Sequence, residues 1–212
     1  MKKIIFLFFF FFSNLQASTV YDYETNIFFK EIIDSIAKVN NFNKNVSFII
    51  ILDDRPNAFV TENNNIIISS GLIKFSDSYE AIVGVLAHEL GHIDKFHVTK
   101  RKQSIEDLNN LNNLTNISIL AGSLISNNSD YIFQSLMGNK LSIQNYFQSF
   151  SREQEREADF YAIETLAKLN LSSVPLKNLL KRLEKDAIKQ GMKNEFYKFS
   201  SHPIYKERYE II

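Results

Sequence analysis

The residues that could do chemistry in this chain are concentrated in His88-Glu89-Leu90-Gly91-His92, which matches the pattern H-E-x-x-H. Residues four apart lie on one face of a helix, so both imidazoles can bind a single Zn²⁺. Glu89 lies about 100° further around the helix, where its carboxylate can reach a water on that metal. The alternative, two core histidines, would bury two polar rings and a carboxylate without obvious partners. The motif therefore predicts a metal centre with Glu89 as the catalytic base.

A catalytic zinc needs a third protein ligand and one open coordination position. One continuation of the motif places a third His six residues after the second, but Val98 stands at that position. His97 lies five residues after His92 and would point elsewhere on a continuous helix. We therefore interpret His97 as a structural or surface residue, and we expect the third ligand to be a Glu from a later helix.

The charged segment from Ser151 to Asp159 supplies such a Glu. Glu155 and Asp159 stand four residues apart, on a predicted helix face that is otherwise apolar. Glu153 and Glu157 fall on the opposite side, which we expect to be solvated. Taken alone, the segment is typical of a charged helix surface. Beside the H-E-x-x-H motif it offers both a ligand and an orienting carboxylate, so we predict Glu155 as the third ligand and Asp159 as the carboxylate that orients a ligating His.

The composition limits both the metal ligands and the partners. The 212 residues include 24 basic and 24 acidic side chains and no Cys, so a thiolate metal site, a disulfide framework and a Cys nucleophile are excluded. A neutral chain gives no broad electrostatic case for binding nucleic acid or an anionic membrane. Any metal must be held by His and carboxylates. We expect one Zn²⁺ per chain, although this ligand set also suits cobalt or manganese.

The first 17 residues have the order of a secretory signal peptide. Lys2 and Lys3 precede an apolar run over residues 4–12, and small residues follow up to Ala17. Such a run is too short to cross a bilayer, which takes about 20 residues. We expect residues 1–17 to be a signal peptide, residues 18–212 to form a single domain without a stable membrane span, and the protein to be exported, most simply to a bacterial periplasm.

The elements that must position these side chains are mostly helices. Apolar spacing predicts helices over residues 24–40, 78–97, 105–125, 143–169 and 175–191. Short apolar runs between turn residues predict strands over 46–52, 58–61 and 66–70, and residues 126–140 are expected to form a loop. The predicted fold class is α+β, mainly helical, with a small β-sheet beside the H-E-x-x-H helix.

Several segments together resemble the HtpX-like and CAAX-prenyl-protease-like zinc metallopeptidases, within the gluzincins. The matching segments are Asn57-Ala58-Phe59, Ser70-Gly71-Leu72, the H-E-x-x-H motif, residues 151–159, and Ser201-His202-Pro203 with Arg208. They follow the family order over residues 57–208. The chain resembles the periplasmic BepA-like branch of this family, and we expect a minimal zincin-like peptidase domain without tetratricopeptide repeats.

The resemblance implies zinc bound by His88, His92 and Glu155. It also implies active-site roles for Asp159 and for His202, which would act either near the scissile carbonyl or as a reversible fourth ligand that closes the site. From the residues alone, His202 before a proline is only a histidine at a turn.

The expected reaction is zinc-dependent hydrolysis of peptide bonds. The substrates would be unfolded or misassembled exported proteins, among them outer-membrane protein assembly intermediates, as the resemblance implies. Either strand 58–61 or strand 66–70 could bind an extended substrate by adding a strand to the sheet. The alternative function is a chaperone-like periplasmic assembly factor whose zinc site is held shut by His202 and is rarely active.

Overall fold

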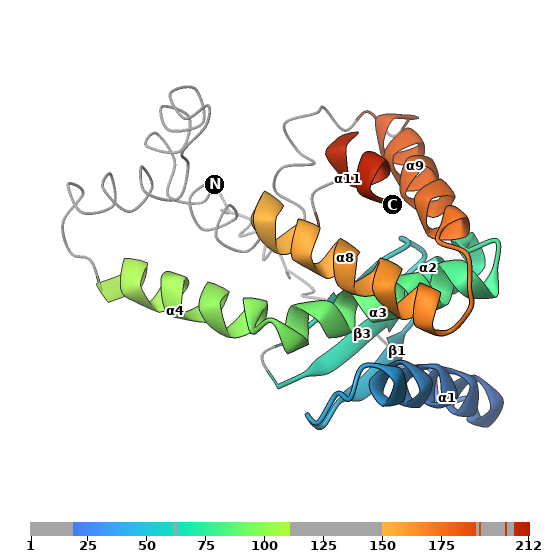
Figure 1. Cartoon of the computed structure of the whole chain (residues 1–212), viewed down its shortest axis with the longest axis horizontal. Coiled ribbons are helices and arrows are strands. Elements are labelled where there is room, and N and C mark those ends of the chain that lie inside the picture. The colour runs from blue at the N-terminus through green and yellow to red at the C-terminus, as the bar shows by residue number, and fades with distance from the viewer. Residues whose placement is uncertain (1–18, 62, 111–149, 190, 192–201, 203–205) are drawn as a thin grey trace, which may run out of the picture.

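The elements around the H-E-x-x-H motif are seen in a computed structural model that describes residues 19–61, 63–110, 150–189, 191, 202 and 206–212 (Figure 1). Most of these residues are helical, and the rest include one three-stranded sheet. The expected α+β, mainly helical class is confirmed. The elements are α1 (Tyr23–Val39), β1 (Ser47–Ile51), β2 (Ala58–Val60), β3 (Asn65–Ser69), α2 (Ser70–Phe75), α3 (Tyr79–Asp94), α4 (His97–Asn110), α8 (Arg152–Lys168), α9 (Val174–Lys189) and α11 (Lys206–Ile211).

The sheet has the strand order β1-β3-β2. β1 pairs with β3 in parallel, from Ser47 opposite Asn65 onward, whereas β2 pairs with β3 antiparallel. Ile66 and Ile68 of the central strand are fully buried, as the apolar run predicted. Because both sides of β3 are paired, the expectation that residues 66–70 could accept a substrate strand is wrong. β2 is paired on one side only within the described residues.

α3 is the helix around which the other elements pack. Val83, Leu86 and Leu90 are almost completely buried, and α1, β2, α8 and α9 all contact this helix. α8 runs alongside α3 (Figure 1). The two helices approach closely at Gly91, where an added Cβ atom would lie 3.1 Å from Tyr161 Cβ and 3.2 Å from Ala158 Cα. The glycine of the motif thus sets the distance between the two helices that carry the predicted ligands.

The helix that carries the motif ends earlier than the sequence predicts. α3 stops at Asp94, Phe96 takes a left-handed backbone conformation with φ of 58°, and α4 begins at His97. The expectation of one continuous helix to His97 is therefore wrong. A non-glycine residue with positive φ cannot continue a right-handed helix, and the break turns the chain between the two helices.

Other boundaries also differ. α2 is not among the elements that the sequence predicts, because Ser70 falls at the end of the strand predicted over 66–70. Ser69 instead caps this helix, and at Gly71 an added Cβ would lie 2.4 Å from the backbone oxygen of Asp54. α8 begins at Arg152 behind a capping box made by Ser151. The expected start at 143, the rest of the helix expected over 105–125 and the loop expected over 126–140 lie outside the described residues.

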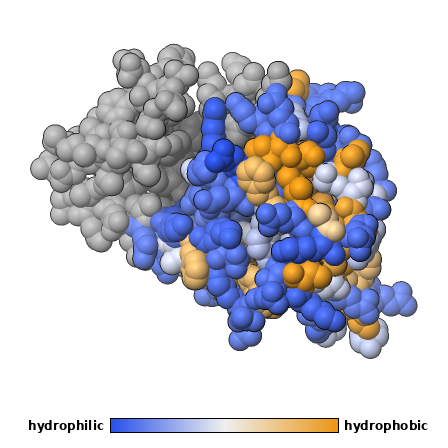
Figure 2. Space-filling model, in the orientation of Figure 1, coloured by the Kyte–Doolittle hydropathy of each residue, from blue (hydrophilic) through white to orange (hydrophobic). Residues whose placement is uncertain are grey.

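The described surface mixes polar and apolar side chains. Figure 2 shows apolar side chains gathered on the right-hand part of the visible face, among hydrophilic ones. Within the described part of the chain, every helix is too short or too polar to cross a membrane.

Candidate metal centre

The predicted site residues come together at the contact between α3 and α8. His88, Glu89 and His92 lie in the second half of α3, and Glu155 and Asp159 lie in the first half of α8. All five residues are at most 5% exposed. Burial of so many ionisable groups is costly unless they are paired or hold a metal, so their arrangement must be accounted for contact by contact.

The two imidazoles of the motif point at one spot. His88 Nε2 lies 3.0 Å from His92 Nε2. The two carboxylate oxygens of Glu155 lie 3.4 Å from His88 Nε2 and 3.5 Å from His92 Nε2. Ligands held about 2.0–2.1 Å from a tetrahedral zinc are about 3.3–3.4 Å apart. The separations of these atoms therefore fit a small tetrahedral ion.

His202 joins the same cluster. Its Nδ1 lies 3.3 Å from His88 Nε2 and 3.1 Å from Glu155 Oε1, and its Nε2 lies 3.3 Å from Glu89 Oε1. One ligand atom from each of His88, His92, Glu155 and His202 can be chosen such that all four lie within 4.8 Å of one another. The cluster thus contains four potential ligands, with Glu89 beside the fourth.

The ionisation of this donor set also fits a bound cation. Burial lowers the pKa of His92 well below its ordinary value, so its ring is neutral. Burial also lowers the pKa of His88, but Asp159 and Glu155 outweigh it and raise that pKa to about 9. In the absence of a metal, a proton on His88 Nε2 would therefore occupy the gap between the two rings. Zinc fits this place, because it would replace that proton and accept both lone pairs.

Asp159 lies behind His88. Its Oδ1 is 2.9 Å from His88 Nδ1, the ring nitrogen that faces away from the cluster, although the N–H direction is poorly aligned with that oxygen. This is the position of a carboxylate that orients a ligating imidazole. The orienting role of Asp159 therefore stays a prediction.

Arg208 of α11 links the two carboxylates of α8. Its Nη1 lies 2.7 Å from Glu155 Oε2, and its Nε and Nη2 each lie 2.7 Å from an oxygen of Asp159. Burial raises the pKa of Glu155, but the charges of Arg208 and His202 outweigh it and hold that pKa well below its ordinary value. The sequence placed Arg208 in a matching segment without a role, because nothing in its local pattern shows which helix it faces.

His97 also lies at the site: it is buried, as the structural alternative predicted, but it points toward His92 and contacts Glu157, and both contacts correct the expectations. Its Nδ1 lies 3.0 Å from His92 Nδ1, and its Nε2 lies 2.8 Å from Glu157 Oε2. His97 is fully buried, whereas Glu157 is partly exposed and contacts this histidine instead of standing apart on a solvated face. Sequence reasoning missed both because it extended α3 through His97. Phe150 covers the other side of His92, with the ring centroids 3.7 Å apart.

Glu89 has the surroundings of a proton acceptor. Burial raises the pKa of Glu89, against the charges of His202 and His88, which lower it. Its Oε2 has no hydrogen-bond partner among the described residues. A carboxylate with a raised pKa can take a proton and release it near neutral pH.

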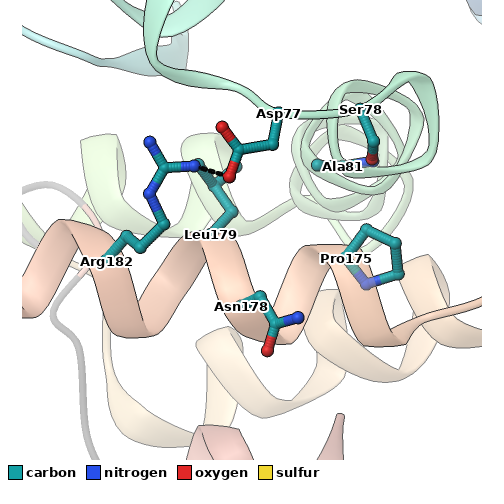
Figure 3. Close-up of a pocket in the computed structure, with 7 residues that line it drawn as sticks. All are labelled: Asp77, Ser78, Ala81, Pro175, Asn178, Leu179 and Arg182. Carbon is teal, nitrogen blue, oxygen red and sulfur yellow. Dashed lines mark hydrogen bonds and ion pairs between the residues drawn. The ribbon is translucent and has the colours of Figure 1, made fainter.

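A separate hollow of about 200 Å³ lies between the start of α3 and α9 (Figure 3). Its charged groups, Asp77 and Arg182, form an ion pair with each other. None of the site residues lines this hollow. Its small size and its internally paired charges give it no place in the chemistry of the metal centre.

Two histidines on one helix, a glutamate beside the first of them and a second glutamate from a neighbouring helix define the class of zinc hydrolases with a His₂Glu ligand set. The sequence model of peptidase family M48 matches residues 25–212, so the chain belongs to this family. This confirms the expected family. It is a family of zinc metallopeptidases, and the cluster of His88, His92, Glu155 and His202 is a group of side chains that could hold such an ion.

Named relatives agree with this class. The chain is 26% identical over 149 residues to the beta-barrel assembly-enhancing protease of Yersinia pestis, covering 70% of this chain and 30% of that protein. It is 24% identical to the protein of the same name in Escherichia coli (strain K12), covering 82% of this chain and 35% of the relative. Identity to the metalloprotease LoiP of Escherichia coli (strain K12) is 29%, covering 82% of this chain and 64% of that protein. The chain thus spans about a third of the assembly-enhancing proteases.

Proposed function

We propose that this chain hydrolyses internal peptide bonds at a zinc ion held by His88, His92 and Glu155. The observation that carries the proposal is the convergence of these three side chains, with ligand atoms 3.0–3.5 Å apart, beside the buried carboxylate of Glu89. Zinc, when bound there, lowers the pKa of a water and polarises the substrate carbonyl.

Glu89 is the proposed base of this reaction. Its carboxylate takes the proton of the attacking water and returns it to the leaving amine. Asp159 orients the ring of His88 through Nδ1, and Arg208 contacts both Asp159 and Glu155 and balances one of their two charges. These residues hold the ligands in place, and Glu89 alone of this group moves a proton.

The proposed substrates are extended polypeptides. β2 contacts α3 and is paired on one side only within the described residues, so its free side could bind a substrate backbone by strand addition. Main-chain hydrogen bonds favour an unfolded segment over a fixed sequence. Proline substitutions at alternate positions of β2 should weaken peptide cleavage if this strand binds substrate.

The proposed location is outside the cytoplasm, most simply in a bacterial periplasm. The order of residues 1–17 is typical of a secretory signal peptide, which supports export. Residues 18–212 are the proposed single peptidase domain. The names of the relatives concern the assembly of β-barrels. We therefore propose that misassembled outer-membrane proteins are among the substrates.

A second function is favoured by His202. The Nδ1 of this residue lies as close to the cluster as a ligand, 3.1 Å from Glu155 Oε1. Four protein ligands would close a tetrahedral zinc and leave no position for water. The chain would then act chiefly as a chaperone-like assembly factor whose peptidase site opens rarely.

The test compares casein cleavage by the purified full chain and by Glu89→Gln, with zinc content measured on both. The expected result is about one zinc per chain in each and a cleavage rate at least about 100-fold lower in the variant. Glu80→Gln, in the first turn of the same helix, is the matched control and should cleave like the wild type. Failure of the wild-type chain to bind zinc would overturn the ligand assignment.

A further inference from the structure

The second ligating histidine of the proposed site is backed by two residues outside the ligand set. His92 Nδ1 contacts His97 Nδ1 at 3.0 Å, and His97 Nε2 contacts Glu157 Oε2 at 2.8 Å. The three side chains come from α3, α4 and α8. The break at Phe96 makes this arrangement possible, because it returns the chain toward His92 immediately after the end of α3.

The protons in this row of side chains can be assigned from their partners. A carboxylate only accepts, so His97 Nε2 must donate to Glu157. A neutral imidazole has one N–H, which leaves His97 Nδ1 as an acceptor. His92 Nδ1 must then donate to His97, and His92 Nε2 carries the lone pair that faces the cluster.

The neutral state of His97 agrees with its surroundings. The side chain is fully buried, and its two ring nitrogens contact His92 Nδ1 and Glu157 Oε2. The stacked ring of Phe150 also restricts His92 to one plane. Both observations support a fixed direction of the hydrogen bonds.

We propose that His97 and Glu157 are positioning residues that fix the tautomer and orientation of His92, so that its Nε2 is available to zinc. The proposal rests on the proposed assignment of His92 as a ligand. The two histidines of the motif would then be oriented in different ways. Asp159 contacts His88 directly, whereas Glu157 acts on His92 through the ring of His97.

Three variants separate the hydrogen bond that Glu157 accepts from the negative charge that it carries. Glu157→Ala removes the acceptor, after which His97 is free to move its proton to Nδ1 and to donate toward His92. Glu157→Gln retains a carbonyl oxygen that can accept from His97. Glu153→Ala removes the same charge one turn earlier on α8, from an exposed residue whose contact is with Arg156, and is the matched control.

The measurement is the zinc dissociation constant of each full-length variant by chelator competition, together with the ¹⁵N resonances of the His97 ring in the zinc-free protein. Loss of an outer partner of a ligating His weakens zinc binding by about tenfold or more. We expect that loss for Glu157→Ala, a smaller loss for Glu157→Gln and wild-type affinity for Glu153→Ala. The His97 proton should lie on Nε2 in the wild type and shift toward Nδ1 in Glu157→Ala.

Two results would overturn the positioning role alone. One is equal zinc affinity of Glu157→Ala and Glu153→Ala, and the other is a wild-type His97 protonated on Nδ1. Melting curves of the zinc-free proteins show whether a loss of affinity reflects loss of folding. If the wild-type chain itself fails to bind zinc, the proposed ligand set fails, and the positioning role fails with it.

Discussion

Charge balance decides what the cluster can hold. Glu155 and Asp159 are both held ionised against the opposing effect of burial, chiefly by Arg208 and the neighbouring histidines. One guanidinium balances only one of these two charges, and Glu89 adds a third carboxyl group. A divalent cation among the imidazole nitrogens compensates this excess better than a proton does, which is why the surroundings favour a metal over a purely hydrogen-bonded core.

The spacing of residues predicted which side chains would meet. The four-residue intervals in His88/His92 and in Glu155/Asp159 are local, and the structure brings all four side chains together. The contacts of His97 and Arg208 were not predicted. The position of His97 depends on the helix break at Phe96, and that of Arg208 depends on how α11 packs against α8. Neither is encoded in a short periodic pattern.

Tyr161 provides a prediction on pH. This side chain is 9% exposed, and its hydroxyl has no hydrogen-bond partner among the described residues. Burial, with the nearby charge of Asp94, raises the pKa of Tyr161 above its ordinary value. The unfolded chain therefore loses this proton first, near pH 10. The stability that the folded chain gains by keeping Tyr161 protonated is fully present below that pH. The free energy of unfolding falls as the pH rises further.

The variant Tyr161→Phe should remove this dependence. Because an unpaired buried hydroxyl is also lost, we expect the free energy of unfolding at pH 7 to rise by about 1 kcal/mol. Urea unfolding at pH 7 and at pH values above 10 measures both effects. Tyr21→Phe, at a position 95% exposed, should follow the wild-type curve. A pH dependence of Tyr161→Phe as steep as that of the wild type would contradict the prediction.

Helices and strands with a strong apolar period were predicted at nearly their observed places. α1, β1, β2, β3 and α9 agree with the expected ranges within two residues. The misses are local backbone events: the left-handed Phe96, and α2, which starts directly after β3 with Ser69 as its cap. Apolar spacing reports which face of an element is buried. It does not report where the backbone changes direction.

The close approach of α3 and α8 provides a prediction at the scale of elements. In Gly91→Ala, the new Cβ would lie 3.2 Å from Ala158 Cα, an atom of the α8 backbone. Relief requires α8 to shift, which displaces Glu155 from the histidines. We expect a loss of about 1–3 kcal/mol in the free energy of unfolding and weaker zinc binding, measured by urea unfolding and chelator competition.

Gly84→Ala is the matched control for this effect. The new Cβ would lie 3.0 Å from Leu176 Cδ2 and 3.1 Å from Leu176 Cβ, so it would press on α9 and not on α8, which carries Glu155. The higher helix propensity of Ala contributes up to about 1 kcal/mol in both variants. For Gly84→Ala we expect a loss of stability similar to that of Gly91→Ala, about 1–3 kcal/mol, but unchanged zinc affinity, because α9 carries none of the proposed ligands. If both variants bound zinc like the wild type, the spacing of α3 and α8 would not control the site.

The metal centre joins parts of the chain that are far apart in sequence. α3 and α8 supply the three proposed ligands, and His202 approaches them from the segment between α9 and α11. α11 then adds Arg208 behind the same carboxylates. The last described part of the chain is thus anchored to the site at two points, and a change in its position would alter access to the metal.

His202→Ala distinguishes an open peptidase from a site that is held shut. His202 Nδ1 lies at ligand distance from the cluster, while its Nε2 lies 3.3 Å from the proposed base Glu89. Removal of the ring frees one coordination position and releases Glu89, whereas His88, His92 and Glu155 can still hold zinc. We expect zinc to be retained and the rate of casein cleavage to rise several-fold.

The double variant Glu89→Gln/His202→Ala is the control for this rise, because any added cleavage must disappear if it takes place at the same metal. A fall in cleavage by His202→Ala, with zinc still bound, would mean that the histidine assists the reaction directly, by stabilising the charge that develops on the scissile carbonyl. A rise would mean that this part of the chain limits access. The sign of the change therefore decides whether the return of the chain after α9 completes the active site or closes it.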